Sequence, residues 1–292
     1  MEGRGLKAAM LVATVAALAV PAAATAAYPG SNGRIFFNDG GAIFSIRPDG
    51  SDRDRVVDPG REPAVSADGK TIVFTREGDI YTASRSGENV NQVTTAKRDE
   101  ADPSFSPNGN KILFAARGQI FTVRAEGGDR TPLRGGGDPE YSPNGDTIVF
   151  SRDTPFPSPT AVAHLFLMDA DGRNVRQLTS GDLARESPTW SPDGNRIAFS
   201  GLTGQTAQIF AANADGTGQL QPVTGENRLG DREPAFAPSG DRLVFRGERN
   251  DRKGLFAVGT TGNPVIEEVI ANPAPDDAAP PAGKDPYWAP SP

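Results

Sequence analysis

The chain contains no cysteine and one histidine, His164. The lack of cysteine excludes disulfides, thiolate metal sites and cysteine nucleophiles. With one histidine, a Ser-His-Asp triad has a single candidate base, and a histidine-rich metal site cannot be assembled. His164 precedes LFLMD at the start of an expected strand, so we interpret it as an ordinary loop or strand-edge histidine. These absences favour a binding protein over an enzyme.

Long apolar runs are also scarce, and the one that is present lies near the start of the chain. Residues 1–27 combine two basic residues, Arg4 and Lys7, with an apolar stretch and the small-residue run AAATAA. This arrangement is typical of a secretory signal peptide. The stretch of about 13 apolar residues is shorter than the roughly 20 that a membrane-spanning helix requires. We therefore predict removal of residues 1–27, no membrane span and a secreted or periplasmic location.

Acidic residues outnumber basic ones, 37 to 30, which gives a formal net charge of −7. Such a chain is repelled by a phosphate backbone, so nucleic acid is not an expected partner. The 34 glycines and 26 prolines are typical of a domain with many short strands and tight turns. We predict that residues 28–292 form a single domain.

One sequence pattern recurs five times. It begins with an acidic residue or serine followed by proline, continues through a glycine-containing turn, and ends in phenylalanine. The copies are EPAVSADGKTIVF (62–74), DPSFSPNGNKILF (102–114), DPEYSPNGDTIVF (138–150), SPTWSPDGNRIAF (187–199) and EPAFAPSGDRLVF (233–245). Proline in the second position of the turn and glycine in the last favour a hairpin. A second hairpin follows each copy, so each repeat predicts a four-stranded blade of a β-propeller.

The two ends of the chain supply complementary halves of a sixth copy. The chain ends in DPYWAPSP (285–292), and NGRIFF (32–37) near the start carries the missing second half. We predict that 31–57 and 285–292 share one blade, in which Tyr287 and Trp288 lie beside Ile35 and Phe37. Such closure leaves no exposed sheet edge. The predicted fold class is therefore all-β, a six-bladed β-propeller of four-stranded blades.

These repeats resemble the WD40-like, or PD40, repeats of the TolB propeller family over about residues 31–292. The resemblance implies a protein-binding propeller in the cell envelope, although the motifs are more specific for the fold than for the function. TolB carries an additional α/β domain before its propeller, through which it contacts other Tol components. We expect the present chain to resemble the TolB propeller without that domain.

An acidic residue precedes the repeated proline in five repeats and lies one place earlier in the sixth. These acids are Glu62, Asp102, Asp138, Glu186, Glu233 and Asp285. The resemblance implies that they gather at one mouth of the central channel. Basic residues lie beside or near them: Arg61, Arg98, Arg185, Arg232 and Lys284. Two interpretations remain open: salt bridges between adjacent blades neutralise the mouth, or the mouth binds a basic peptide segment or an oxygen-ligated cation such as Ca²⁺.

Three further segments could carry function. DADGRN, with Asp169, Asp171 and Asn174, resembles the start of a calcium loop, but other repeats have hairpin turns at the same place. The glutamate that completes a calcium loop is also missing, so we predict a turn and no dedicated cofactor. Residues 152–163 and 272–284 are proline-rich and interrupt the repeats. Extended proline-rich segments can contact a partner, but long connections at a propeller rim are commonly passive, so we predict passive surface loops there.

The sequence as a whole predicts an exported, monomeric scaffold that presents one face of a disc to a partner. The expected partner is an envelope or secreted protein, including one associated with peptidoglycan. The alternative is a hydrolase or lyase that acts on a glycan or peptide and uses the acids at the channel mouth as a catalytic pair.

Overall fold

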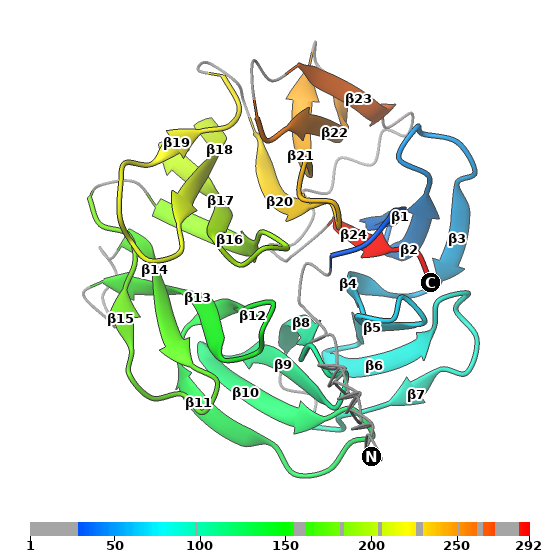
Figure 1. The fold of residues 1–292 in the computed structure, drawn as a ribbon. Helices are drawn as coiled ribbons and strands as arrows, with labels where there is room; N and C mark the ends of the chain where they lie inside the picture. The colour runs from blue at the N-terminus through cyan, green and yellow to red at the C-terminus, as the bar shows by residue number, and fades with distance from the viewer. Residues whose placement is uncertain are drawn as a thin grey trace, which may run out of the picture.

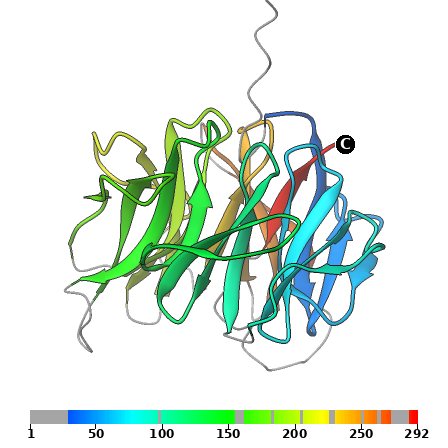
Figure 2. The same ribbon diagram turned by 90° about the horizontal axis from the view of Figure 1, so that it is seen from below.

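The computed structural model describes residues 29–96, 99–154, 162–181, 184–203, 206–225, 230–249, 252–261, 265–271 and 286–292. Within these ranges the strands form six four-stranded antiparallel sheets, which surround a central axis as blades (Figure 1). A view turned by 90° shows the strands running between the two faces of a disc (Figure 2). The predicted all-β, six-bladed propeller is thus confirmed. None of the described residues belongs to a helix of the length and apolarity that would cross a membrane.

Each blade contains four strands, which follow one another from the axis outward. Blade 1 has β24 (Tyr287–Pro290), β1 (Asn32–Asp39), β2 (Ala42–Ile46) and β3 (Asp54–Val57). Blade 2 has β4 (Arg61–Val65), β5 (Thr71–Arg76), β6 (Asp79–Ser84) and β7 (Asn91–Gln92). Blade 3 has β8 (Glu100–Phe105), β9 (Lys111–Ala116), β10 (Gln119–Arg124) and β11 (Thr131–Gly135).

The remaining three blades follow the same order. Blade 4 has β12 (Gly137–Tyr141), β13 (Thr147–Thr154), β14 (Val162–Asp169) and β15 (Arg176–Gln177). Blade 5 has β16 (Ala184–Trp190), β17 (Arg196–Thr203), β18 (Thr206–Asn213) and β19 (Gln221–Pro222). Blade 6 has β20 (Arg232–Phe236), β21 (Arg242–Arg249), β22 (Arg252–Gly259) and β23 (Ile266–Ala271).

The repeated turn joins the first two strands of blades 2 to 6 as predicted. In blade 5 the Gly194 N–H donates to the Ser191 carbonyl at 2.9 Å, which closes the four-residue turn. Gly194 has a φ of 71°, a conformation that glycine adopts without steric cost. The Asp193 carboxylate accepts hydrogen bonds from the Ser191 hydroxyl and the Asn195 N–H. The turn is therefore held by contacts among its own residues.

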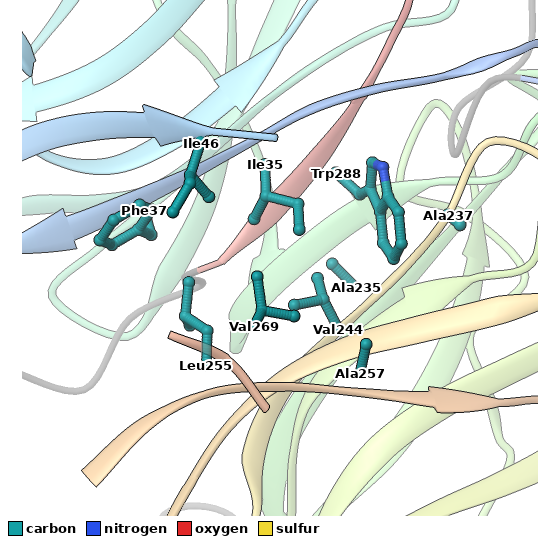
Figure 3. Packing of buried hydrophobic residues seen from close by; sticks show 10 residues of the cluster. All are labelled: Ile35, Phe37, Ile46, Ala235, Ala237, Val244, Leu255, Ala257, Val269 and Trp288. Carbon is teal, nitrogen blue, oxygen red and sulfur yellow. The ribbon is translucent and has the colours of Figure 1, made fainter. Parts of the chain in front are cut away.

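The two ends of the chain meet in blade 1, where β24 pairs antiparallel with β1. Trp288 lies opposite Ile35 as predicted, whereas Tyr287 lies opposite Phe36 and not beside Phe37. An irregularity in β1 between Asn32 and Ile35 sets this register. The indole of Trp288 packs between blades 1 and 6 with Ile35 and other apolar side chains (Figure 3).

Apolar side chains fill the interface between each pair of adjacent blades, and six buried clusters result among the described residues. The phenylalanine that ends each repeat is fully buried, as Phe74, Phe114 and Phe150 illustrate. The alternation of inward and outward side chains places these rings between neighbouring sheets. The hydrophobic core is therefore a ring of inter-blade layers.

Both ends of one segment predicted as a loop belong to strands. The sequence predicts a loop over residues 152–163, but Arg152 pairs with His164, and Thr154 pairs with Val162, as part of the β13–β14 ladder. The prolines at positions 155, 157 and 159 favour a loop, but the residues on either side of them, 152–154 and 162–164, continue the strand pairing. The second proline-rich segment, 272–284, lies outside the described residues.

Candidate functional site

The predicted channel-mouth positions coincide with a backbone irregularity. In each of blades 2 to 6, the inner strand shifts register at the residue that precedes proline. These residues have φ values between 47° and 55°: Glu62, Asp102, Asp138, Ser187 and Glu233. Left-handed backbone at a residue other than glycine costs about 1–3 kcal/mol and persists only where the surroundings enforce it. The repeated bulge therefore aims these side chains in one defined direction.

Three of the predicted acids join neighbouring blades through the backbone. Glu62 Oε2 accepts the N–H of Asp102 at 3.1 Å, across the interface between blades 2 and 3. Asp102 Oδ2 accepts the N–H of Asp138 at 3.4 Å, and Asp138 Oδ2 accepts the N–H of Ser187 at 3.3 Å. Each carboxylate thus binds the equivalent residue of the next blade. We call the three hydrogen bonds accepted by Glu62, Asp102 and Asp138 the latch ring. Charge-assisted hydrogen bonds of this type contribute about 1.5–3 kcal/mol each to stability.

Glu233 occupies the same position in blade 6 but has different partners. Its N–H donates to the Ser200 hydroxyl at 2.9 Å, so a serine replaces the carboxylate of the preceding blade. Its carboxylate forms an ion pair with Arg246, with an N–O distance of 3.1 Å. Sequence reasoning missed Arg246, because it lies on the second strand of the blade and not beside an acid.

The predicted basic residues divide into three groups. Arg61 and Arg232 are exposed, whereas Arg185 is buried, with 3% of its surface accessible. Arg98 and Lys284, together with the acid Asp285, lie outside the described residues. One interpretation of the sequence assigns these carboxylates to salt bridges between blades. In the latch ring, the carboxylates accept hydrogen bonds from backbone N–H groups of the next blade.

Glu186 departs from the latch ring because Ser187 occupies the repeat position in blade 5. Glu186 is half-buried one residue earlier in β16. Burial raises its pKa above the usual value of 4.5, and the charges of Asp138 and Asp153 raise it further, against an opposing effect of Arg232. Within the described ranges Glu186 forms no ion pair. The carboxylates of Asp138 and Asp153 therefore lie close enough to Glu186 for their charges to act on it.

The channel is narrow directly below the mouth. Prolines of five repeats line it at this level: Pro63, Pro103, Pro188, Pro234 and Pro286. The space they enclose has a volume of about 20 Å³, close to the room that a single water molecule needs. At this level the described residues leave room on the axis for about one water molecule.

The single histidine is buried, in contrast to the predicted loop or strand-edge position. His164 lies in β14 with 6% of its surface accessible, and its Nδ1 is 3.3 Å from Arg185 Nη1. This pair joins blades 4 and 5 beside Glu186. Burial lowers the pKa of Arg185. Sequence reasoning could not detect the pair, because its members lie 21 positions apart.

The calcium-like segment forms a hairpin turn. The Gly172 N–H donates to the Asp169 carbonyl at 2.8 Å, and Asp171 Oδ1 accepts the Arg173 N–H at 3.0 Å. Asn174 Nδ2 donates to Asp169 Oδ2 at 2.6 Å. Turn contacts thus use the oxygens that a calcium loop would offer. In the portion of the chain that the structure describes, no group of three or more His, Asp or Glu residues has an arrangement that could hold a metal ion.

Two residues near the mouth were missed as individual candidates. Asp153 lies in β13 within the segment predicted as a loop, and its charge acts on Glu186. Glu140 lines the channel, and its Oε1 accepts hydrogen bonds from the Thr189 hydroxyl and the Trp190 N–H. Neither residue occupies the acid-proline position that guided the sequence analysis.

Part of the chain is similar in sequence to proteins of the TolB propeller family. Residues 136–263 match the model of the TolB beta propeller domain, PD40. A segment of 60 residues, 20% of this chain, is 42% identical to the Tol-Pal system protein TolB of Coxiella burnetii and spans 14% of that protein's length.

Two solved structures share the fold. The crystal structure of TolB from Acinetobacter baumannii superposes with a TM-score of 0.72 at 24% identity, over 89% of this chain and 67% of that one. The structure of putative TolB from Agrobacterium tumefaciens gives a TM-score of 0.67 at 22% identity, over 83% of this chain and 90% of that one. The six-bladed propeller fold is thereby confirmed, and residues 136–263 match the TolB-type, PD40 propeller family.

Proposed function

We propose that this chain is an exported scaffold of the cell envelope whose mouth face binds a basic segment of a protein partner. The mouth face is the side of the disc on which Glu62, Asp102, Asp138, Ser187 and Glu233 begin the inner strands. The observation that carries the proposal is the position of Glu186, which is half-buried near Asp138 and Asp153 and stands outside the latch ring. The similarity to a Tol-Pal system protein supports an envelope location.

A lysine or arginine side chain is the ligand that best matches these charges. Burial raises the pKa of Glu186 most, and the charges of Asp138 and Asp153 raise it further. A cation placed near these carboxylates offsets their mutual repulsion. A metal ion would need tight oxygen coordination, which the described residues do not offer. A flexible basic side chain can instead reach separate carboxylates from above the face.

The narrow channel supports binding of a surface segment over binding of a deep substrate. Since the prolines leave about 20 Å³ below the mouth, a partner contacts the rim and not the axis. Contacts of this kind depend on charge and on the fixed direction of the rim side chains. The hydrogen bonds of the latch ring hold the inner strands of neighbouring blades together and so keep the rim side chains in fixed directions.

The proposal is tested by capture followed by direct binding. Immobilised protein of residues 28–292 is incubated with envelope extract from the host, and cross-linked peptides are identified by mass spectrometry. We expect a lysine- or arginine-rich peptide cross-linked near Glu186. A synthetic copy of that peptide should bind about tenfold more weakly to Glu186→Gln, and binding should weaken with added salt.

The matched control is Glu126→Gln, which removes an exposed acid from the turn between β10 and β11. It should leave affinity for the peptide unchanged. A captured partner that binds Glu186→Gln as tightly as the unaltered protein would contradict the proposed site.

A second function rests on the same glutamate. A carboxyl group with a raised pKa beside an ionised carboxylate is the arrangement that glycoside hydrolases use as acid and base. Glu186 would donate the proton and Asp138 would act as the second carboxylate. Turnover on a panel of glycans that is abolished by Glu186→Gln, with partner capture intact, would favour this enzyme over the scaffold.

A further inference from the structure

Every blade contains a stacked pair of aromatic rings from its second and third strands. The pairs are Phe37–Phe44, Phe74–Tyr81, Phe114–Phe121, Phe150–Phe166, Phe199–Phe210 and Phe245–Phe256, with ring centroids 5.6–6.1 Å apart. Among the described residues, an arginine guanidinium lies over a ring of the pair in five blades: Arg53, Arg76, Arg130, Arg152 and Arg249. Arginine is well suited to this place, because its planar cation stacks on a ring while its edge bonds an acceptor.

Four of these arginines have an oxygen acceptor within the protein. Arg249 bonds both oxygens of the fully buried Asp231, at 2.6 and 2.9 Å. Arg130 bonds the buried Glu100 at 2.7 Å. The two others bond a carboxylate and a carbonyl, since Arg53 pairs with Asp39 and Arg76 Nε donates to the Pro59 carbonyl at 2.8 Å. In these four blades an arginine guanidinium thus stacks on an aromatic ring and donates a hydrogen bond to an oxygen acceptor.

Arg152 of blade 4 has the ring, but the described residues give it no such oxygen. Its guanidinium carbon lies 4.0 Å from the centroid of Phe166. Its Nε is buried and has no hydrogen-bond partner, and in the described part of the chain no carboxylate lies within ion-pair distance of it. Burial lowers the pKa of Arg152, and the nearby Arg134 lowers it further. The described residues thus partly desolvate this cation without providing an acceptor, which is costly.

A pocket of about 300 Å³ lies at this arginine, between blades 3 and 4 on the mouth face. Its other lining includes small residues, Ala101, Ala115, Ala116, Gly136 and Gly137. A Cβ at Gly136 would lie 2.6 Å from the Phe150 ring, so a side chain there cannot fill the space without displacing the stacked pair. The hollow is therefore fixed by the same packing that holds Arg152.

Charges at the edge of the pocket narrow the class of ligand. Arg117 adds a second cation, whereas Asp99 and Asp153 are acids. Two acids repel a doubly charged anion such as phosphate more strongly than a single carboxylate. They also attract an ammonium group, so a molecule with both charges is matched best.

We propose that this pocket binds a small carboxylate, of the amino acid or short peptide class, whose carboxylate completes the pair with Arg152. The ammonium group of the ligand faces Asp99 or Asp153. This pocket shares Asp153 with the site proposed for a basic partner segment. That site depends on Glu186 and this one on Arg152, so variants of these two residues distinguish the failure of one proposal from the failure of the other.

The test is titration of the protein by NMR with three probes: L-alanine, acetate and L-alaninamide, which lacks the carboxylate. We expect saturable binding of L-alanine, weaker binding of acetate, and none of L-alaninamide. Arg152→Gln should lower the affinity for L-alanine at least about tenfold, the effect of one lost charge-assisted hydrogen bond. Arg76→Gln is the matched control, since Arg76 lies over the rings of blade 2 but bonds a protein carbonyl, and it should leave the affinity unchanged.

Arg152→Lys serves if Arg152→Gln does not fold, because lysine keeps the charge but loses the fork that binds a carboxylate with two parallel bonds. It should also weaken binding. The proposal is overturned if neither L-alanine nor acetate binds saturably, if the Arg152 variants bind L-alanine as the unaltered protein does, or if inorganic phosphate binds more tightly than either probe.

Discussion

Two interfaces of the ring differ in a way that chain connectivity does not explain. Blades 6 and 1 meet where the chain ends return to each other, yet Trp288, Ile35 and Val244 pack there in a buried cluster (Figure 3). Blades 3 and 4 are joined directly by the chain between β11 and β12 and also bury an apolar cluster, yet a pocket of about 300 Å³ opens at the mouth-face end of their interface. The size and pairing of side chains, and not backbone continuity, thus decide how tightly two blades close.

The largest expected effect tests closure at the interface between blades 6 and 1. Trp288→Ala should lower the free energy of unfolding by about 3–5 kcal/mol, because it removes a buried ring from an inter-blade cluster. Truncation after residue 284 should cost more, since it also leaves β1 without its axial partner. Thermal and urea denaturation measure both effects.

Trp190→Ala is the control for that prediction. Trp190 occupies the equivalent place in blade 5, within the uninterrupted chain, and is similarly buried. Equal losses for Trp190 and Trp288 would show that the chain ends close the ring as firmly as a continuous blade. An unchanged melting temperature for Trp288→Ala would show that this side chain does not stabilise the closure of the ring.

The second prediction contrasts the arginine that has an acceptor with the one that lacks it. Arg249→Gln should destabilise by about 3–5 kcal/mol, because it leaves Asp231 buried without its ion pair. Arg152→Gln should cost about 1 kcal/mol or less, since it removes only a ring contact. Urea denaturation of both variants measures the difference, and equal losses would show that Arg152 has an acceptor in the free protein.

The latch between blades 3 and 4 gives a smaller effect. Asp102→Ala should destabilise by about 1.5–3 kcal/mol, since it removes the acceptor of the Asp138 N–H. Glu62→Ala removes the corresponding latch between blades 2 and 3, where the bond is 3.1 Å and not 3.4 Å. Hydrogen exchange of the Asp138 and Asp102 amides should report which latch is weaker. Faster exchange at Asp138 is expected.

The smallest effect concerns Glu186 in β16 of blade 5. Its pKa in the folded protein is raised by burial and by Asp138 and Asp153, so folding takes up protons above the ordinary pKa. Stability therefore falls as the pH rises through that window. Glu186→Gln should be slightly more stable than the unaltered protein at neutral pH and equal to it well below pH 4.5.

Urea denaturation between about pH 4 and pH 8 measures that difference. The exposed Glu126→Gln variant should show no such pH dependence. A Glu186→Gln variant that is less stable at neutral pH would mean that a cation already pairs with this carboxylate.

Local sequence determined the blades because each depends on residues close together in the chain. The turn at Ser191 to Gly194 closes within four residues, and the alternation before Phe199 places that ring inside. The incomplete copies at the two ends predicted the shared blade because each carries one half of the local pattern and lacks the other. The acids at the channel mouth were also identified, since they precede a repeated proline.

Only the tertiary structure decided which partner each charged group meets. The latch bonds join residues 36 to 49 positions apart, and their form depends on the bulge at each acid. The departure of Glu186 from that ring, and the lack of an acceptor for Arg152 among the described residues, depend on which side chains the fold brings together. A repeat pattern shows which residues the blades have in common. The candidate binding sites arise where one blade differs from the others, and their chemistry depends on side chains from different blades that only the folded structure brings together.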